Sequence, residues 1–371
     1  MNNLFIELIQ VSINCRPSLS RIPSLEDWLE LFRQAKRQSL IGVCFWGITR
    51  IKHQHNNLPR DLYLKWLALA IQIKQQNENM NALSLAVYNK LTSDGFDCCI
   101  LKGQAIATFY RQELREFRQS GDVDAFVISD PETVFQYVQK QSPMRIDASY
   151  KHIHWDYFQS INVDLHYRLS ASRNLIRNSK LQKWTKSVVV ERDLYFDDVL
   201  KVKTLSKEYN IFFILYHIYW HFLYEGVGLR QIMDLYYILI STKDDDIITS
   251  VNNRIREFKI EKFTSAIMWI LKELFMIEDK YLLLQPNEKE GRFLLSEIFL
   301  SGNMGYYDDR NISKHSKSNI VRCITKIKHY LRLVSHYPSE LLWTPIGSMY
   351  FLQKQKSIDK LIDGLTRKVA N

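Results

Sequence analysis

The first 92 residues carry apolar side chains at helical spacing. The stretch that opens at Ser24 has Asp27 three residues later, a combination typical of a helix N-terminus, where the two side chains accept hydrogen bonds from otherwise unpaired backbone N–H groups. Residues 58–93 keep the helical period without a break and are followed by Asp94-Gly95, a helix stop. The pattern therefore predicts a helical N-terminal region over residues 1–92.

Between residues 93 and 205 the pattern changes to short apolar runs. The runs FDCCILKG, DVDAFVI, MRIDASY, KHIHWDYF and INVDLHYRL predict strands, with one helix after the first run and another that begins near Pro131. Two further segments, SVVVERD and LKVKTL, are also predicted to be β-like. The order strand–helix–strand–helix–strand–strand–strand predicts a small mixed sheet.

From residue 206 onward the helical period returns. The most apolar stretch, residues 211–224, is short and contains two histidines, so it predicts a buried helix rather than a membrane span. Residues 319–336 predict a basic amphipathic helix whose apolar stripe packs on the protein, with an anionic membrane or nucleic acid as the alternative partner. The expected fold class is α+β, in three regions: 1–92, 93–205 and 206–371.

Composition and charge narrow the class of protein. A chain of 371 residues with 46% hydrophobic content can bury a large core. The net charge of +10 favours anionic partners such as nucleotides, nucleic acid or a membrane surface. The five cysteines are scattered without metal-ligand spacing, which is typical of a reducing compartment, and the N-terminus has no signal-peptide pattern. The sequence thus predicts a cytoplasmic protein with no transmembrane segment.

Two acidic residues stand at the head of the apolar run DVDAFVI. Residues two apart share one face of a strand, so Asp122 and Asp124 are expected to project together, away from the core-facing Val123, Ala125 and Val127. A solvated strand start is the alternative explanation of such a pair. Because Mg²⁺ prefers oxygen ligands, usually one or two carboxylates plus substrate phosphates, the pair is a candidate site for Mg²⁺ or Mn²⁺.

A third carboxylate lies in the run INVDLHYRL. Asp164 is expected to share a strand face with His166 and Arg168, opposite the apolar residues of the run. If this strand neighbours the strand of Asp124, Asp164 joins the acidic pair. Three carboxylates around one or two metal ions are suited to phosphoryl or nucleotidyl transfer.

A candidate phosphate-binding turn lies about twenty residues before the acidic pair. In CILKGQAIATFY, Lys102-Gly103 separates a predicted strand from a predicted helix, and a glycine there lets backbone N–H groups approach a phosphate. The Lys102 ammonium can reach phosphate oxygens, and the Arg118 guanidinium can fork onto them. An ordinary turn explains Lys102-Gly103 taken alone, but its combination with three carboxylates in one compact α/β segment favours a nucleotide site.

These segments together resemble a known family. ILKGQAIATFY, RQSGDVDAFV and VDLHYRL are similar to the Lys-Gly, Arg-x-x-Gly-Asp-x-Asp and Asp-Leu-His-x-Arg motifs of the uncharacterised bacterial nucleotidyltransferase family, within the DNA polymerase beta nucleotidyltransferase superfamily. The segment HFLYEGVGLRQIMDLYYIL resembles the helical region of that family through His221, Arg230 and Asp234. The resemblance covers roughly residues 80–240 and implies a small mixed-sheet nucleotidyltransferase core flanked by helical regions.

The resemblance implies Mg²⁺-dependent transfer of a nucleoside monophosphate from a nucleoside triphosphate, ATP among the candidates, to an acceptor hydroxyl, with release of pyrophosphate. Asp122 and Asp124 match the metal ligands, and Asp164 matches the third carboxylate, which would bind the catalytic metal and help deprotonate the acceptor. The candidate nucleotide-binding residues are Lys102, Gly103, Gln104, Arg118 and Gly121. The candidate substrate contacts are His166, Arg168, His221 and Arg230. The acceptor would be a small molecule or a protein, bound by the 206–371 region.

One residue departs from the superfamily pattern. The turn is usually Gly-Ser, whereas here Gly103 is followed by Gln104. The departure motivates an alternative function, a catalytically impaired nucleotidyltransferase fold that binds nucleotide or RNA. A nucleic-acid enzyme of the same superfamily is a third hypothesis, consistent with the basic charge, and it predicts strongly salt-dependent binding.

Two histidine pairs are further candidates. His217 and His221 have the i, i+4 spacing of a zinc site, but a buried, hydrogen-bonded pair is the alternative because the sequence offers no clear third ligand. His152 and His154 alternate along a predicted strand, so they are expected either to face the site beside Asp164 or to be partly exposed.

Arg230 and Asp234 are also four residues apart, which predicts a helical ion pair between them.

Overall fold

The structure is a computed structural model that describes residues 3–51, 53–142, 144–158, 162–191, 194–308, 310 and 318–370. The chain forms two compact units, each assembled from separate stretches of sequence. The helical unit consists of Met1–Asn79, Phe109–Ser120 and Ile214–His336. The sheet unit consists of Met80–Thr108, Gly121–Phe213 and Tyr337–Asn371. The division into regions 1–92, 93–205 and 206–371 stays a prediction.

Short helices make up most of the helical unit. They are α1 (Asn3–Ser12), α2 (Leu25–Arg37), α3 (Ile41–Arg50), α6 (Gln112–Arg115), α10 (Leu229–Ile240), α11 (Asp245–Glu257), α12 (Glu261–Phe275), α13 (Glu288–Ser301) and α14 (Asn319–Val334). Two longer helices, α4 (Arg60–Ser93) and α9 (Lys207–Tyr224), contribute residues to both units. The capping box predicted at Ser24 is present, and the predicted long helix is α4, followed by Gly95 at a φ of 89°.

The sheet unit is built on one mixed sheet of six strands in the order β3-β4-β2-β1-β6-β5. The strands are β1 (Cys98–Leu101), β2 (Val123–Val127), β3 (His152–His154), β4 (Val163–His166), β5 (Leu194–Asp197) and β6 (Val202–Leu205). The helices of this unit, beside the ends of α4 and α9, are α5 (Lys102–Ala107), α7 (Pro131–Gln141), α8 (Leu175–Glu191), α15 (Pro338–Leu341) and α16 (Thr344–Ala370). The α+β fold class expected from the sequence is confirmed.

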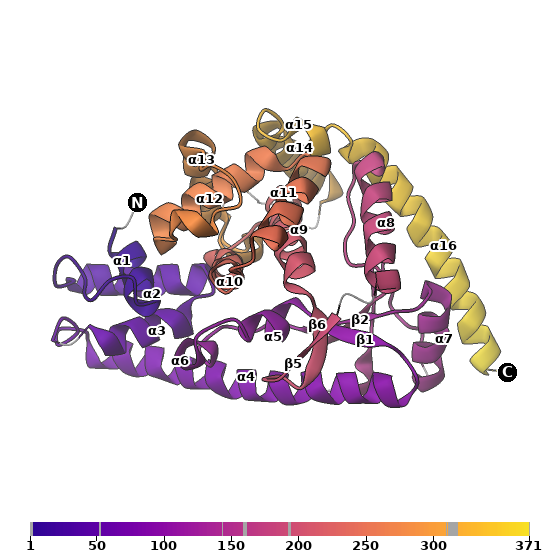
Figure 1. Ribbon diagram of the computed structural model, residues 1–371, viewed down its shortest axis with the longest axis horizontal. Coiled ribbons are helices and arrows are strands. Elements are labelled where there is room, and N and C mark those ends of the chain that lie inside the picture. The colour runs from indigo at the N-terminus through magenta and orange to yellow at the C-terminus, as the bar shows by residue number, and fades with distance from the viewer. Residues whose placement is uncertain are drawn as a thin grey trace. The chain divides into compact units, whose positions relative to one another are not determined.

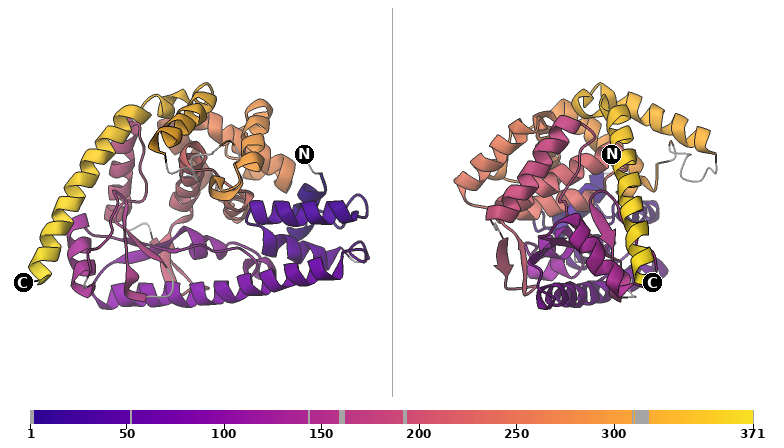
Figure 2. Two further views of the ribbon diagram at one scale, coloured as in Figure 1. Left: turned by 180° about the vertical axis from the view of Figure 1, so that it is seen from behind. Right: turned by 90° about the vertical axis from the view of Figure 1, so that its right-hand side faces the viewer.

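One face of the sheet packs on helices and forms the core. Val123, Ala125 and Val127 of β2 lie in this core, as the alternation of the sequence predicted. Residues from the end of α4, from α7 and from α16 pack against them, and Figures 1 and 2 both show α16 lying along α7. The alternate side chains of β2 and β4 project from the other face, which is the face that carries the acidic residues.

Two of the predicted strands are wrong. SVVVERD was predicted β-like because of its valines, but residues 187–191 are the last turns of α8. Leu181, Trp184 and Val188 are buried at helical spacing, so packing along a helix overrides the β-propensity of the valines. MRIDASY forms no regular strand within its described residues, since Ala148 pairs with Ile153 as an isolated bridge.

The apolar C-terminal segments differ in what covers them. Residues 211–224 lie in α9 and are largely buried, and no helix among the described residues is long and apolar enough to cross a membrane. In α14, by contrast, the predicted burial of the apolar stripe is wrong, because Ile320 and Leu331 are 72% and 67% exposed. That helix packs through its other side, where His329 donates a hydrogen bond to the carbonyl oxygen of Leu223.

Candidate active site

The acidic residues meet because their strands are neighbours. β2 and β4 run parallel, and the register sets Asp124 directly beside Asp164. β3 pairs antiparallel with β4 and sets His154 beside Asp164 and His152 beside His166. Three adjacent strands therefore present five side chains that can bind metal on one face of the sheet. The register makes the two strands neighbours, as the expectation required, and brings Asp164 to Asp124, the member of the acidic pair that lies on β2.

Asp124 is buried and held between two nitrogen groups. Its Oδ1 atom accepts hydrogen bonds from Lys102 Nζ at 2.8 Å and from His166 Nε2 at 2.7 Å. Burial alone would raise the pKa of this carboxyl, but the Lys102 ammonium and the His166 imidazole outweigh it and hold the pKa well below its usual range. Asp124 is therefore a carboxylate that stays ionised by means of its partners.

Asp164 has a different environment. Its Oδ1 lies 2.5 Å from His154 Nδ1, and its Oδ2 lies 3.5 Å from His152 Nε2. Burial raises the pKa of Asp164, and the nearby carboxylate of Asp124 adds to the effect, although His154 opposes it. Burial also lowers the pKa of His152 to about 3, so this imidazole is neutral at physiological pH. Asp164 therefore lacks a permanent cation of the kind that Asp124 has in Lys102.

The predicted phosphate turn has an unusual backbone. β1 ends at Leu101, and both Lys102 and Gly103 have a positive φ, of 43° and 22°. A positive φ is costly for a lysine, and such strain is typically retained where it positions a functional side chain. Here the strained backbone accompanies a contact of the Lys102 ammonium with Asp124. The sequence analysis expected this ammonium to bind a phosphate.

Gln104, which follows the turn, is held by a hydrogen bond of its side-chain amide. Its Nε2 donates a hydrogen bond to Asn81 Oδ1 of α4 at 2.5 Å. Its Oε1 is buried without a hydrogen-bond partner among the described residues. The side chain therefore ties the turn to α4 and leaves one acceptor atom unused.

Three other predicted residues of the sheet unit lie around these groups. Asp122 and Gly121 precede β2 and are exposed, and a side chain added at Gly121 would meet open space. The guanidinium of Arg168 donates to the carbonyl oxygen of Tyr150 at 2.7 Å and lies over the Tyr150 ring at 4.4 Å. Asp122 is thus the acidic residue of the motif that is open to solvent.

Arg118, predicted to bind phosphate, belongs to the helical unit and is paired there. Its Nε and Nη2 atoms donate to the two carboxylate oxygens of Asp234 at 2.7 and 2.8 Å, and Tyr110 Oη donates to Oδ1 at 2.7 Å. The pair is buried, and the pKa of Arg118 is raised by Asp234 although burial opposes it. Its Nη1 atom is also buried, and it has no hydrogen-bond partner among the described residues. Phosphate binding by Arg118 stays a prediction.

The remaining predicted residues also lie in the helical unit. Asp234, which the sequence pairs with Arg230, is instead the partner of Arg118, and Arg230 Nη1 donates to the carbonyl oxygen of Gln119 at 2.9 Å. His221 Nδ1 lies 2.8 Å from a carboxylate oxygen of Glu225. The two imidazole rings of the His217–His221 pair have centroids 4.1 Å apart.

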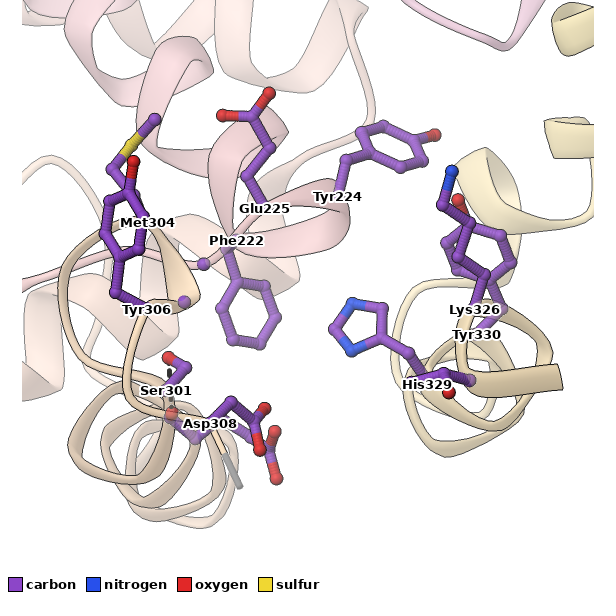
Figure 3. A pocket seen from close by; sticks show the side chains of 14 residues that line it. Phe222, Tyr224, Glu225, Ser301, Met304, Tyr306, Asp308, Lys326, His329 and Tyr330 are labelled. Carbon is purple, nitrogen blue, oxygen red and sulfur yellow. Dashed lines mark hydrogen bonds between the residues drawn. The ribbon is translucent and has the colours of Figure 1, made fainter. Parts of the chain in front are cut away.

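A separate cavity of about 420 Å³ lies within the helical unit, between α9, α13 and α14 (Figure 3). The His329 ring points into it from α14, opposite Phe222 of α9 (Figure 3). Glu297, one of the acidic residues that line the cavity, binds the guanidinium of Arg310 through two bonds of 3.0 Å and that of Arg332 at 3.1 Å. Arg332 also donates to His329 Nδ1, so the imidazole is neutral with its proton on Nε2. The volume is in the range of small-molecule pockets.

The residues on the sheet face fit a divalent cation. Two buried carboxylates side by side repel each other, and positive charge between them would relieve that repulsion. The ligating atoms of Asp124, Asp164 and His166 all lie within 4.8 Å of one another. Asp122 lies just before β2 and is exposed, so its role as a third carboxylate ligand stays a prediction. The carboxylate oxygens of this donor set are therefore suited to a hard cation such as Mg²⁺.

Sequence reasoning missed the partners of two of these groups. The contact between Lys102 and Asp124 and the pair between Arg118 and Asp234 join residues 22 and 116 positions apart. For the second pair the sequence offered a nearer partner, Arg230, so spacing pointed to the wrong arginine. His154 beside Asp164 was one of two stated alternatives, and the alternation His152-x-His154 was the signal for it.

The comparisons with known proteins place the chain in a family. The structure of an antigenic nucleotidyltransferase-like protein from Paracoccidioides brasiliensis is similar at 14% identity and a TM-score of 0.30, over 48% of this chain and 88% of that chain, which is too distant to say anything about function. No curated protein matches the sequence. The family described as uncharacterised nucleotidyltransferase matches residues 24–276, which is more than half of the 371 residues. The chain therefore belongs to the uncharacterised nucleotidyltransferase family.

Proposed function

We propose that the protein is a Mg²⁺-dependent nucleotidyltransferase that moves a nucleoside monophosphate from a nucleoside triphosphate to an acceptor hydroxyl and releases pyrophosphate. One observation carries the proposal: Asp124 and Asp164 stand side by side on adjacent parallel strands. Asp122 directly precedes the first of these strands. The ammonium of Lys102 contacts the carboxylate of Asp124. Membership of the family supports the reaction class.

In the proposed reaction Asp122, Asp124 and Asp164 would hold the metal ion. When bound, Mg²⁺ or Mn²⁺ polarises the phosphoryl oxygens and offsets the charge that develops on them. The acceptor oxygen forms a bond to the α-phosphorus, the bond from that phosphorus to the pyrophosphate oxygen breaks, and Asp164 takes the hydroxyl proton. Lys102 would exchange its contact with Asp124 for a triphosphate oxygen, as a point charge on a flexible stem can.

The test is transfer of label from each nucleoside triphosphate, labelled at the α-phosphate, in the presence of Mg²⁺ and a cell extract. The expected result is a labelled product together with free pyrophosphate, both lost in Asp164→Asn. An unlabelled extract and no pyrophosphate with any of the four nucleotides would overturn the proposal. Binding of the nucleotide itself is followed separately, by calorimetry.

A second function is favoured by one observation, the position of Lys102. Its ammonium lies 2.8 Å from the carboxylate oxygen that would otherwise face the metal, and Gln104 replaces the usual serine. A protein in which Lys102 permanently substitutes for the cation would bind nucleotide or RNA without catalysis. It would bind nucleotide equally well with Mg²⁺ and with a chelator, and Lys102→Met would abolish that binding.

The acceptor is not identified by the residues of the sheet face. The predicted acceptor-binding region 206–371 contains every residue that lines the cavity of Figure 3, and this aromatic and charged lining suits a small molecule with both ring and polar groups. A protein side chain remains the alternative acceptor, and nucleic acid is a weaker one. A cytoplasmic location stays a prediction from the cysteines.

A further inference from the structure

The sheet face carries histidines that the proposed transfer reaction does not use. His152 and His154 alternate along β3, so both side chains leave the same face, while Ile153 between them is in the core. The register of β3 against β4 brings both of them to Asp164, with His154 directly opposite it. Nitrogen and oxygen donors from two neighbouring strands therefore meet on one side of Asp164.

The geometry of these three residues is close to that of a metal site. His152 Nε2 lies 3.5 Å from Asp164 Oδ2, and two ligand atoms bound to one tetrahedral zinc ion are about 3.3 Å apart, given bonds of about 2.0–2.1 Å. His154 Nδ1 lies nearer, at 2.5 Å from Oδ1, so it would move away by less than 1 Å, roughly, to share an ion. The His154 side chain is 53% exposed and has room for that movement. All three ligand atoms lie within 4.8 Å of one another.

The donor set differs in kind from that of the acidic motif. Asp122 and Asp124 offer oxygen alone, which suits Mg²⁺, whereas imidazole nitrogens suit zinc, cobalt and similar first-row metals. Two histidines and one carboxylate are also a complete set of protein ligands for an open zinc site, which leaves one position for water or substrate.

We propose that His152, His154 and Asp164 form a second metal site that binds a first-row transition-metal dication, Zn²⁺ best among them, beside the Mg²⁺ site and sharing the carboxylate of Asp164 with it. The donor set stands on its own, and only the sharing of Asp164 rests on the proposed function. A hydrogen-bonded His154 that merely orients Asp164 is the rival explanation.

The experiment uses the full chain without a histidine tag, stripped of metal and titrated with Co²⁺ and Zn²⁺. We expect one equivalent of Co²⁺ to give the visible absorption of a low-symmetry site with nitrogen ligands, and Zn²⁺ to displace it. In His154→Asn the affinity for Zn²⁺ should fall at least about tenfold. The same loss of Zn²⁺ affinity is expected in a second variant, His152→Asn. His53→Asn, which replaces an exposed histidine of the helical unit, is the matched control and should bind as the wild type does.

The outcomes separate the two proposals. Unaltered Zn²⁺ affinity in both histidine variants, with circular dichroism showing them folded, or no binding by the wild type, overturns the second site. Asp122→Asn should keep Zn²⁺ binding while it weakens Mg²⁺ binding, since Asp122 is not in the histidine set. If no nucleotide is transferred under any condition but Zn²⁺ binds and is lost in His154→Asn, the proposed function fails and the second site stands.

Discussion

Two buried acidic residues of the sheet face, Asp124 and Asp164, differ from two of the helical unit, Asp234 and Glu297, in the groups that neutralise them. On the sheet face, Asp124 is paired with an ammonium and an imidazole, and Asp164 lies against imidazoles. In the helical unit, Asp234 and Glu297 are paired with arginines, each through at least two hydrogen bonds.

The two kinds of partner differ in whether the carboxylate can exchange them for a metal ion. A guanidinium stays charged at any physiological pH and matches a carboxylate with two fixed N–H groups, so an arginine pair is a closed structural unit. A lysine turns on a flexible stem, and a neutral imidazole can ligate a metal. The acids of the sheet face are therefore available to a cation, whereas Asp234 and Glu297 hold the fold of the helical unit together. The predictions below test this contrast.

The largest effect is expected at Asp124, the buried acid of the sheet face. Asp124→Asn keeps the size of the side chain but removes its charge, so nucleotidyl transfer should fall at least about a thousandfold, or about 4 kcal/mol in the transition state. The initial rate of pyrophosphate release measures it, with circular dichroism to show that the fold persists. Near-wild-type transfer by this variant would exclude Asp124 as a metal ligand.

The next effect concerns stability in the helical unit. Asp234→Asn leaves the buried Arg118 guanidinium without its counter-charge, so the free energy of unfolding should fall by about 3–5 kcal/mol. Urea denaturation measures it. The matched control is Asp359→Asn, which removes an exposed partner of Arg145 and should cost less than about 1 kcal/mol. Equal effects of the two variants would contradict the structural role of Asp234.

A smaller loss is expected at Glu297. Glu297→Gln weakens its bonds to Arg310 and Arg332, but both arginines are partly exposed and can be solvated, so the loss should be about 1–3 kcal/mol. Affinity for Mg²⁺ and Zn²⁺ should not change, whereas Asp164→Asn should reduce both. Calorimetric titration of the two variants with Mg²⁺ and Zn²⁺ measures these affinities. Loss of metal affinity in Glu297→Gln would contradict the difference between the acids of the sheet face and Glu297.

The smallest effects on stability are expected at two glycines of the predicted nucleotide site, and they should differ between the two. Gly103 has a φ of 22°, so Gly103→Ala should destabilise the protein by about 1–2 kcal/mol through backbone strain. Gly121→Ala meets open space and should change stability by less than about 0.5 kcal/mol. If the triphosphate approaches the backbone at Gly121, the same substitution weakens nucleotide binding, which calorimetry with ATP measures. A stability loss at Gly121 larger than at Gly103 would contradict this account.

Much of the fold follows from local patterns. The α4 helix and the Ser24 cap could be predicted because period, cap and stop are all encoded within a few neighbouring residues. The valines of α8 were misread because β-branched residues favour strands locally, while burial of Leu181, Trp184 and Val188 along one side decides for a helix. Propensity is thus a guide only where packing agrees with it.

The candidate site was predictable in part for the same reason. Alternation along a strand predicted that Asp122 shares a face with Asp124, and His152 with His154. The structure has both histidines on β3, whereas Asp122 precedes β2. No local pattern encodes the partner of a long side chain. Asp234 was therefore paired with Arg230, while the structure pairs it with Arg118, and the contact of Lys102 with Asp124 was not foreseen.

The sequence by itself determined the family, and it supplied the candidates for its chemistry, the acidic motif and the glycine turn, because these depend on residue type and short spacing. Only the tertiary structure decided that β2 and β4 are neighbours in the register that joins Asp124 to Asp164, and that β3 adds its histidines. Strand order and register arise from burial across the whole sheet, which pairs residues 40 positions apart for reasons that neither segment contains alone.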